Sequence, residues 1–175
     1  MKDYFDLLEL PLSFRPDPEL LKKHYYRLSR SYHPDHYTMA DDKVREEVLL
    51  ISGDINTAYK VLSDEQKRLS YLLHFLNVLK DGEHEVMSQE FLMEIMDINE
   101  AIFDLEIDYN EDRKSEIINE IGIKMKEFNN NLDKAIDLFE NQADRESALK
   151  NIKENYLKIR YILRIQENIS KFATL

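Results

Sequence analysis

Apolar residues recur every three or four positions along almost the whole chain. This spacing places them on one side of an α-helix. Only three glycines and four prolines punctuate the 175 residues. A β-rich protein needs many turns, and glycine and proline are the residues that most often form them. The pattern therefore predicts an all-α fold built from long helices.

The N-terminal part predicts a helical hairpin interrupted by a His-Pro-Asp tripeptide. One apolar stripe runs through Leu21, Tyr25, Leu28 and Tyr32, and Pro34 disfavours helical geometry at the preceding residue, so this helix should end near Tyr32. A second stripe comprises Val48, Ile51, Ile55, Ala58 and Leu62. The segment "YFDLLEL" should pack across the hairpin. A shorter helix should follow, opened by a capping box of Ser63 and Gln66.

The segment "NVLKDGEHEVMS" interrupts the helical periodicity and marks a predicted domain boundary. We expect an N-terminal domain over residues 1–78, a linker over 79–87 and a C-terminal domain over 88–175. Ser88 is the expected N-cap of the next helix. Three long stripes follow it, the last running through Ile159, Leu163 and Gln166, and they predict an antiparallel three-helix bundle.

Composition narrows the possible functions. The chain has no cysteine, which argues against disulfides, thiol nucleophiles and cysteine-held zinc or iron–sulfur clusters. The formal charge of -11 argues against binding nucleic acid over a broad surface. No apolar run is long enough to cross a membrane, and folded-looking sequence begins at the N-terminus without a signal segment. A cytoplasmic protein is the expectation.

The first long helix carries a basic face that contrasts with the acidic chain. Lys22, Lys23, Arg27 and Arg30 cluster with Tyr26 on the side away from the apolar stripe. One interpretation is an ordinary solvated helix face. The other is a docking site for an acidic partner, which is favoured because this face leads directly into the His-Pro-Asp segment.

Residues 83 to 112 have the opposite character. They contain eleven acidic residues and no Lys or Arg. Phe91, Ile95, Ile98, Ile102 and Leu105 already form a complete core stripe in this segment. A second set of side chains lies beside that stripe: Leu92, Met93, Met96, Asp97, Glu100 and Asp104. The apolar members of this set either pack beneath a neighbouring element or form a binding patch for an apolar and basic partner.

The tripeptide and the following histidine contain side chains that could bind a metal ion or take part in catalysis. His33, Asp35 and His36 offer three metal ligands, but no fourth ligand is suggested by the spacing of the other histidines. A catalytic pair of His33 and Asp35 would need a nucleophile and an oxyanion cradle, and the chain has no G-x-S-x-G or glycine-rich phosphate loop. We therefore predict no enzyme activity, no metal site and no bound cofactor, and interpret this loop as a recognition element.

Two groups of motifs resemble a known family. The basic helix ending "YHPD" and the later "INTAYKVLSDEQKR" resemble the J-domain of DnaJ-type co-chaperones over residues 3 to about 76. The motifs "YFDLLELP", "YLLHFL" and "FLMEIMD" are similar to those of the HscB family, J-proteins of iron–sulfur cluster biogenesis, over essentially the whole chain.

The resemblance implies a two-sided adaptor. Its J-domain would dock on a DnaK/HscA-type chaperone and stimulate ATP hydrolysis there, and its C-terminal domain would present an IscU-type scaffold, promoting cluster transfer. The implied chaperone-binding residues are Lys22, Lys23, Tyr26, Arg27, Arg30, His33, Pro34 and Asp35. The implied scaffold-binding residues are Leu92, Met93, Met96, Asp97, Glu100, Asp104 and Tyr161. An alternative keeps the J-domain but makes the C-terminal bundle a general client-binding arm.

The chain departs from the family pattern at several positions. His36 stands where many J-domains have lysine, which makes the charge at that position depend on pH. Met96, Asp97 and Asp104 stand in place of a more usual leucine and glutamates. The N-terminal cysteine zinc module of eukaryotic relatives is missing, which points to the bacterial type.

Overall fold

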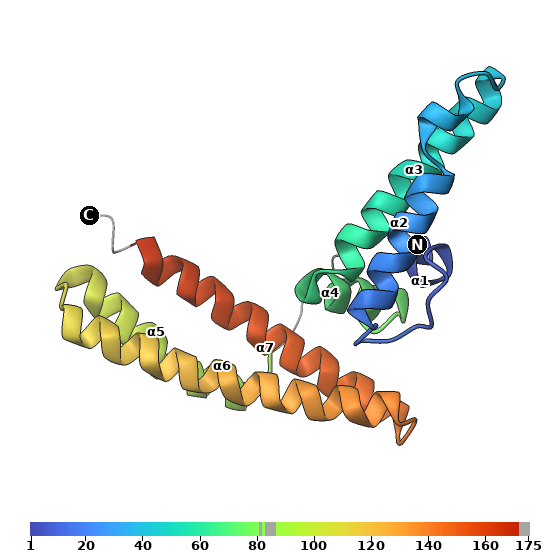
Figure 1. Cartoon of the computed structure of the whole chain (residues 1–175). Coiled ribbons are helices and arrows are strands. Elements are labelled where there is room, and N and C mark those ends of the chain that lie inside the picture. The colour runs from blue at the N-terminus through green and yellow to red at the C-terminus, as the bar shows by residue number, and fades with distance from the viewer. Residues whose placement is uncertain (81, 83–86, 172–175) are drawn as a thin grey trace. The chain divides into compact units, whose positions relative to one another are not determined.

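The computed structural model describes residues 1–80, 82 and 87–171, and within them all regular structure is helical (Figure 1). The predicted all-α fold is confirmed. The chain divides into two compact units, Met1–Asn77 and the residues from Val78 onward. Part of the predicted linker, Asp81 and residues 83–86, lies outside the described residues, as do Glu83 and Glu85 of the acidic segment. In the described helices, no stretch is long and apolar enough to span a lipid bilayer.

The first unit is a helical hairpin with two smaller helices packed against it. Its elements are α1 (Tyr4–Leu7), α2 (Pro18–Ser31), the 3₁₀ helix η1 (Pro34–Tyr37), α3 (Asp42–Leu62) and α4 (Glu65–Phe75). α2 and α3 lie side by side and run in opposite directions (Figure 1). The Asp17 side chain caps α2 by accepting a hydrogen bond from the Glu19 N–H at 2.9 Å, and Pro18 occupies the first helical position.

The core of the first unit follows the predicted stripes. Leu21 and Leu28 of α2 are buried, as are Ile55, Ala58 and Leu62 of α3. The segment around α1 contributes Phe5 and Leu8 to this core. Burial of these apolar side chains is the main favourable contribution to the stability of the hairpin, at about 25 cal/mol per Å² removed from water.

The predicted capping box of Ser63 and Gln66 is wrong. Ser63 has helical dihedral angles, φ -78° and ψ -18°, and its N–H still donates to the Tyr59 carbonyl, so it closes α3. The N-cap of α4 is Asp64, which is extended, at φ -100° and ψ 121°, and accepts from the Lys67 N–H at 3.0 Å. An N-cap requires a non-helical backbone, and only Asp64 has one here.

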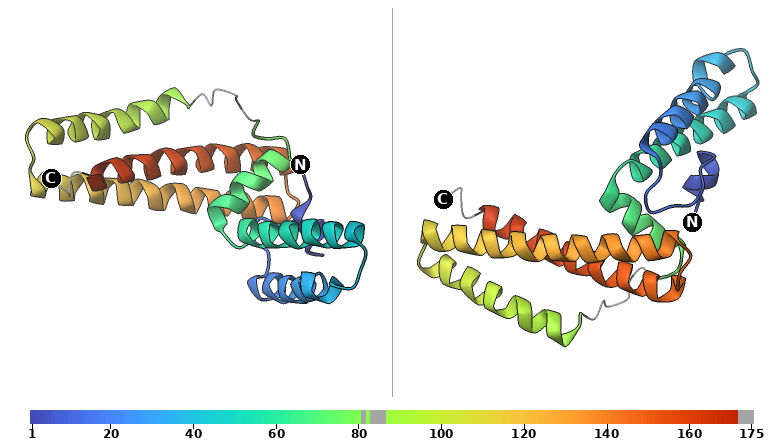
Figure 2. Two further views of the ribbon diagram at one scale, coloured as in Figure 1. Left: turned by 90° about the horizontal axis from the view of Figure 1, so that it is seen from above. Right: turned by 60° about the horizontal axis from the view of Figure 1, so that its bottom comes forward.

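The second unit is the predicted antiparallel three-helix bundle (Figure 2). It contains α5 (Gln89–Ile107), α6 (Glu111–Glu140) and α7 (Arg145–Lys171), joined by short turns. Ser88 is the N-cap of α5, as expected, with its hydroxyl accepting from the Phe91 N–H at 3.2 Å. α6 and α7 pair along most of their lengths, and α5 packs against α6 (Figures 1 and 2).

Two of the predicted core stripes in this unit need correction. On α5 the fourth core position is Ala101, which is 7 % exposed, whereas the expected Ile102 is only half-buried. On α7 the buried residues after Ile159 are Ile162, Ile165 and Ile169. The expected Leu163 and Gln166 are exposed. Because a helix has 3.6 residues per turn, steps of three and of four residues both stay near the same side, and the neighbouring helices decide which of two adjacent positions is covered.

Candidate functional site

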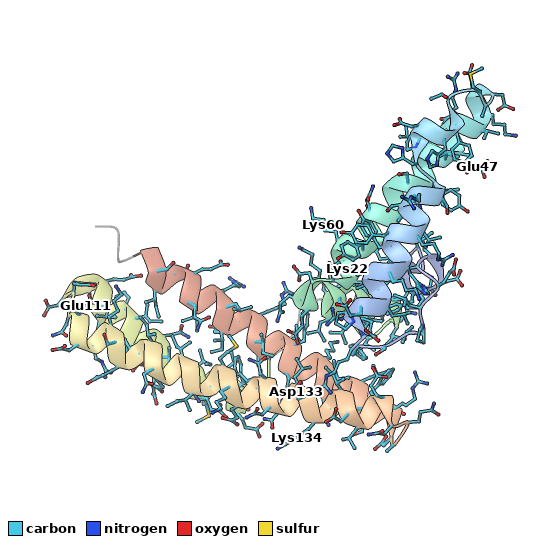
Figure 3. All side chains as sticks on the ribbon, in the orientation of Figure 1. Lys22, Glu47, Lys60, Glu111, Asp133 and Lys134 are labelled. Carbon is cyan, nitrogen blue, oxygen red and sulfur yellow. The ribbon has the colours of Figure 1, made fainter. Side chains whose placement is uncertain are left out.

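The basic face of α2 is exposed in full. Lys22, Lys23, Tyr26, Arg27 and Arg30 all have exposed side chains, and Lys22 is labelled in Figure 3. Arg27 is paired with Glu9 of the segment after α1, at the surface. Ion pairs between exposed side chains contribute little to stability, so the Arg27 guanidinium remains accessible to a competing carboxylate.

Tyr25 holds this face in place. Its ring stacks on Tyr59 of α3 with centroids 4.1 Å apart, and its hydroxyl donates to the Asn56 carboxamide at 3.0 Å. The neighbouring Tyr26 faces outward and is 61 % exposed. The register of α2 against α3 therefore turns the cationic side chains toward solvent.

The His-Pro-Asp segment forms an ordered turn. His33 is the extended N-cap residue of η1, and Pro34 occupies the first position of that helix. The His33 Nδ1 accepts a hydrogen bond from the Asp35 N–H at 3.3 Å and lies 3.6 Å from the Asp35 carboxylate. The Tyr37 hydroxyl donates to the Ser31 carbonyl at 3.1 Å, which fastens the turn to the end of α2. The side chains of His33 and Asp35 are 54 % and 83 % exposed, so the turn displays both to a partner.

A shallow depression joins this turn to the basic face. Its lining residues are Tyr26, Arg27, Ser29, Arg30, Ser31, His33 and His36. No carboxylate is among these described lining residues, and the Ser29 hydroxyl is buried there without a hydrogen-bond partner in the described part of the chain. The two guanidinium groups favour an acidic group from another molecule. No group of three potential metal ligands occurs among the described residues.

The other predicted surface lies on α5. Leu92, Met93 and Met96 are 47 %, 72 % and 56 % exposed, so they do not pack beneath α6 or α7. The side chains of Asp97, Glu100 and Asp104 are exposed beside them. A shallow groove brings part of this set together, and its lining residues are Leu92, Met96, Asn99, Glu100, Phe103 and Asp104. Met93 and Asp97 lie outside the groove lining.

Tyr161 is placed next to this groove but does not line it. Its hydroxyl accepts a hydrogen bond from the Asn99 side chain at 3.3 Å, and its ring packs edge-on against Phe91 with centroids 5.5 Å apart. It is half-buried and lines a separate hollow with residues such as Leu157 and Arg160. Tyr161 thus connects α7 to α5 and fixes Asn99 at the edge of the groove.

Two groove residues, Asn99 and Phe103, are absent from the predicted set. Phe103 is 60 % exposed, an unusual position for a large aromatic side chain. The signal was available, because Leu92, Met96 and Phe103 are spaced four and seven residues apart and share one side of a helix. The predicted set includes the acidic residues Asp97, Glu100 and Asp104 but omits Phe103.

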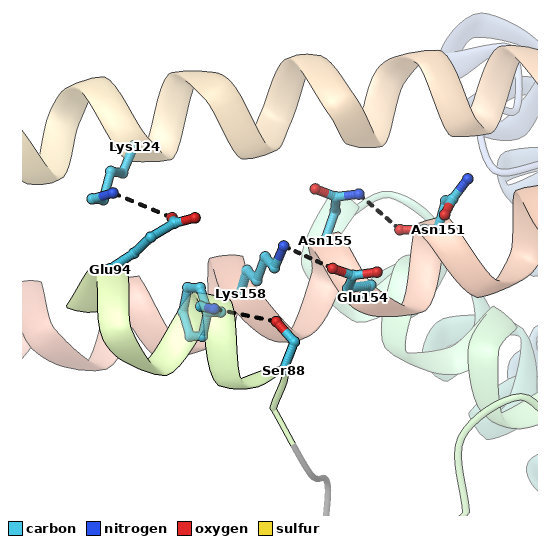
Figure 4. A network of polar contacts seen from close by, with 8 residues as sticks. Ser88, Glu94, Lys124, Asn151, Glu154, Asn155 and Lys158 are labelled. Atoms are coloured by element: carbon cyan, nitrogen blue, oxygen red, sulfur yellow. Dashed lines mark hydrogen bonds and ion pairs between the residues drawn. The ribbon is translucent and has the colours of Figure 1, made fainter. Parts of the chain in front are cut away.

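A network of polar contacts holds α5 on the bundle (Figure 4). Lys124 of α6 donates to the Glu94 carboxylate at 3.3 Å. Lys158 of α7 pairs with Glu154 at 2.7 Å. The Lys158 ammonium group lies 5.8 Å from the ring centroid of Phe91 on α5 and 5.5 Å from that of Phe128 on α6. Both lysines contact α5, because Glu94 and Phe91 belong to it, so the groove is built on a helix held from two sides.

Comparison with known proteins agrees with this geometry. Residues 3–71 match the DnaJ domain, and residues 87–170 match the HSCB C-terminal oligomerisation domain. The chain is 34 % identical over 170 residues to the human iron-sulfur cluster co-chaperone protein HscB, covering 96 % of this chain and 67 % of that protein. The crystal structure of human HscB superposes with a TM-score of 0.71 at 31 % identity, covering 99 % of this chain and 83 % of that one. The HscB chaperone from Vibrio cholerae shares the fold, with a TM-score of 0.63 at 21 % identity over 99 % and 98 % of the two chains.

A DnaJ domain with an exposed His-Pro-Asp turn, followed by a separate helical domain, defines a J-domain co-chaperone. This class does not catalyse reactions itself, which confirms the prediction that the chain is not an enzyme. The chain belongs to the HscB family of iron–sulfur cluster co-chaperones. A J-domain implies a partner of the Hsp70 type, and the HscB family implies an IscU-type scaffold protein.

Proposed function

We propose that this chain delivers an IscU-type iron–sulfur scaffold to a DnaK/HscA-type chaperone and stimulates the ATPase of that chaperone. In this proposal residues 1–78 act as the chaperone-binding domain and residues 88–175 as the scaffold-binding domain. The observation that carries it is the presence of two unlike exposed surfaces on separate units. One is basic and ends in the His-Pro-Asp turn, and the other is apolar with an acidic rim.

The chaperone surface is proposed to work by charge and shape together. Lys22, Lys23, Arg27 and Arg30 would attract an acidic surface and raise the association rate. Tyr26 and the η1 turn would supply the close contact, because the Asp35 N–H bond to His33 keeps the turn in one conformation before binding. ATP hydrolysis would take place in the chaperone.

The scaffold surface is proposed to use the exposed apolar side chains of α5. Leu92, Met93 and Met96 would be removed from water by the partner, while Asp97, Glu100 and Asp104 would pair with its basic residues. Tyr161 would support the edge of this surface through Asn99. Coupling follows from holding both partners at once, because a bound scaffold is then presented to the chaperone at high effective concentration.

The test of the chaperone surface is the ATPase rate of the purified chaperone with the full-length chain. His33→Gln should abolish stimulation and leave the affinity for the scaffold unchanged. His74→Gln is the matched control, because this histidine lies on α4 and bonds the Ser70 carbonyl within its own helix. Normal stimulation by the His33 variant would refute the assignment of the turn.

The test of the scaffold surface is a binding titration with the scaffold. Replacing Leu92, Met93 and Met96 together by alanine should remove binding of the scaffold while stimulation of the chaperone alone persists. Unchanged scaffold binding by this variant would instead favour a general client-binding arm.

A further inference from the structure

A second apolar stripe runs along the solvent side of α5 for nearly its whole length. It consists of Leu92, Met96, Phe103 and Ile107, spaced four, seven and four residues apart, and their side chains are 47 %, 56 %, 60 % and 72 % exposed. At about 1.5 Å per residue, the stripe is roughly 22 Å long. The core stripe of Phe91, Ile95, Ile98, Ala101 and Leu105 occupies the other side of the helix. A helix that is apolar on both sides normally has a partner on each.

The stripe has a consistently acidic border. Between Gln89 and Ile107 there are six acidic residues and no basic one. Glu94 is neutralised by Lys124, but Asp97, Glu100 and Asp104 have no ion pair within the described residues. Glu100 and Asp104 line the groove together with Phe103. Asn99, which interrupts the stripe between Met96 and Phe103, is already bonded to the Tyr161 hydroxyl.

This charge pattern argues for a basic partner and against a second copy of the chain. A two-fold symmetric pairing through this face would bring the same carboxylates of both copies together, on chains that each carry a net charge of -11. A partner segment with Lys or Arg beside apolar side chains would satisfy the carboxylates and cover the stripe at the same time.

We propose that Phe103 and Ile107 extend the scaffold-binding face of α5 and select a partner segment whose apolar side chains are flanked by Lys or Arg. This inference rests on the proposed function, because it assigns the occupant of the same helix face. It adds the C-terminal half of α5 to the contact, with Phe103 as its central anchor. Aromatic side chains, Phe among them, are enriched at interfaces, where a few buried anchors carry most of the binding energy.

The experiment is an isothermal titration of the IscU-type scaffold encoded in the same genome into the full-length chain, at low and at high salt. Phe103→Ala should raise the Kd about tenfold at both salt concentrations, since it removes apolar contact. Ile107→Ala should raise the Kd by a smaller factor. Glu100→Gln should reduce the salt dependence, since it removes a charge from the rim. Ile123→Ala is the matched control, because Ile123 is 62 % exposed on α6 and does not line the groove.

The possible results distinguish failure of this inference from failure of the proposed function. If the unmodified chain does not bind the scaffold, both fail. If the triple alanine variant at Leu92, Met93 and Met96 loses binding but Phe103→Ala binds like the unmodified chain, only the present inference is overturned. Sedimentation analysis tests whether this face instead joins two copies of the chain. A chain that self-associates and becomes monomeric through Phe103→Ala would show that this face joins two copies, which also overturns the inference.

Discussion

The Tyr71 hydroxyl joins the N-terminal segment to α4, and Tyr71→Phe isolates the contribution of that hydroxyl to stability. The side chain is only 7 % exposed. Its hydroxyl donates to the Lys2 carbonyl at 3.0 Å and accepts from the Tyr4 N–H at 2.9 Å. The ring stacks on the Tyr4 ring with centroids 4.7 Å apart, and phenylalanine keeps this stack. The substitution therefore removes two hydrogen bonds and little apolar contact.

The expected loss of stability follows from these two bonds. At roughly 1 kcal/mol for each net hydrogen bond, Tyr71→Phe should lower the free energy of unfolding of the first unit by about 2 kcal/mol. Native-state hydrogen exchange on the full chain measures this directly. Core amides of the first unit, such as that of Leu62, should exchange about 30-fold faster. Core amides of the second unit, such as that of Ile152, serve as the internal control.

Deletion of a tyrosine hydroxyl at the surface is the matched control for Tyr71→Phe. Tyr26→Phe removes the hydroxyl of a side chain that is 61 % exposed and should change the exchange rates of the same amides by little. A change of less than about 0.5 kcal/mol in the free energy of unfolding on Tyr71→Phe would contradict this prediction. Water would then have replaced both lost bonds.

Tyr71 also makes a prediction about alkaline stability. Burial, the largest cause, raises the pKa of the Tyr71 phenol above its usual value near 10. The folded state therefore favours the neutral phenol. Its contribution is complete below the unfolded-state pKa and is lost as the pH rises through the higher folded-state pKa. The stability difference between the unmodified chain and Tyr71→Phe should accordingly shrink above about pH 10. A difference that grows with pH would contradict this.

Three further predictions concern individual side chains. Asp64→Ala should cost the first unit about 1 kcal/mol at neutral pH, since it removes the α4 cap. Because hydrogen bonds from Lys67 lower the pKa of the Asp64 carboxyl, this contribution is present above the unfolded-state pKa and should disappear in an acid titration of stability as the pH falls through the folded-state pKa. Ile95→Ala, at a site with no exposed surface, should lower the unfolding free energy of the second unit by about 3 kcal/mol in denaturant titrations. Glu94→Gln should cost under about 1 kcal/mol, and less at high salt in thermal unfolding, because its pair with Lys124 is half-exposed.

Much of the fold could be predicted because the helices are long and their buried sides are strongly periodic. Leu21, Leu28, Ile55 and Leu62 lie in the core where the pattern indicated them. The exact core register was less predictable. On α5 the pattern predicted that Ile102 lies in the core. The small Ala101 is buried instead, and this choice depends on the position of the adjacent helices.

The two candidate sites also differ in how much of each could be predicted from the sequence. The His-Pro-Asp turn and the basic residues before it are close in sequence, so a motif identifies them without any knowledge of packing. The groove of α5 was recognised only in part. The spacing places Phe103 on one side of the helix with Leu92 and Met96, but a sequence pattern cannot say which of two apolar sides is covered. The structure decides this, because α6 and α7 cover the side with Ile95 and leave the side with Phe103 in water.

The sequence by itself determined the class of fold, the helix order, the His-Pro-Asp turn and the presence of one basic and one acidic surface. These properties depend on local spacing and on the charge of neighbouring residues. Only the tertiary structure decided that Asp64 caps α4, that Tyr161 reaches Asn99, and that Phe103 lines the groove. The last two depend on contacts between helices distant in sequence, and the first depends on the residue at which α3 ends. Local periodicity specifies neither the contacts between distant helices nor the residue at which α3 ends.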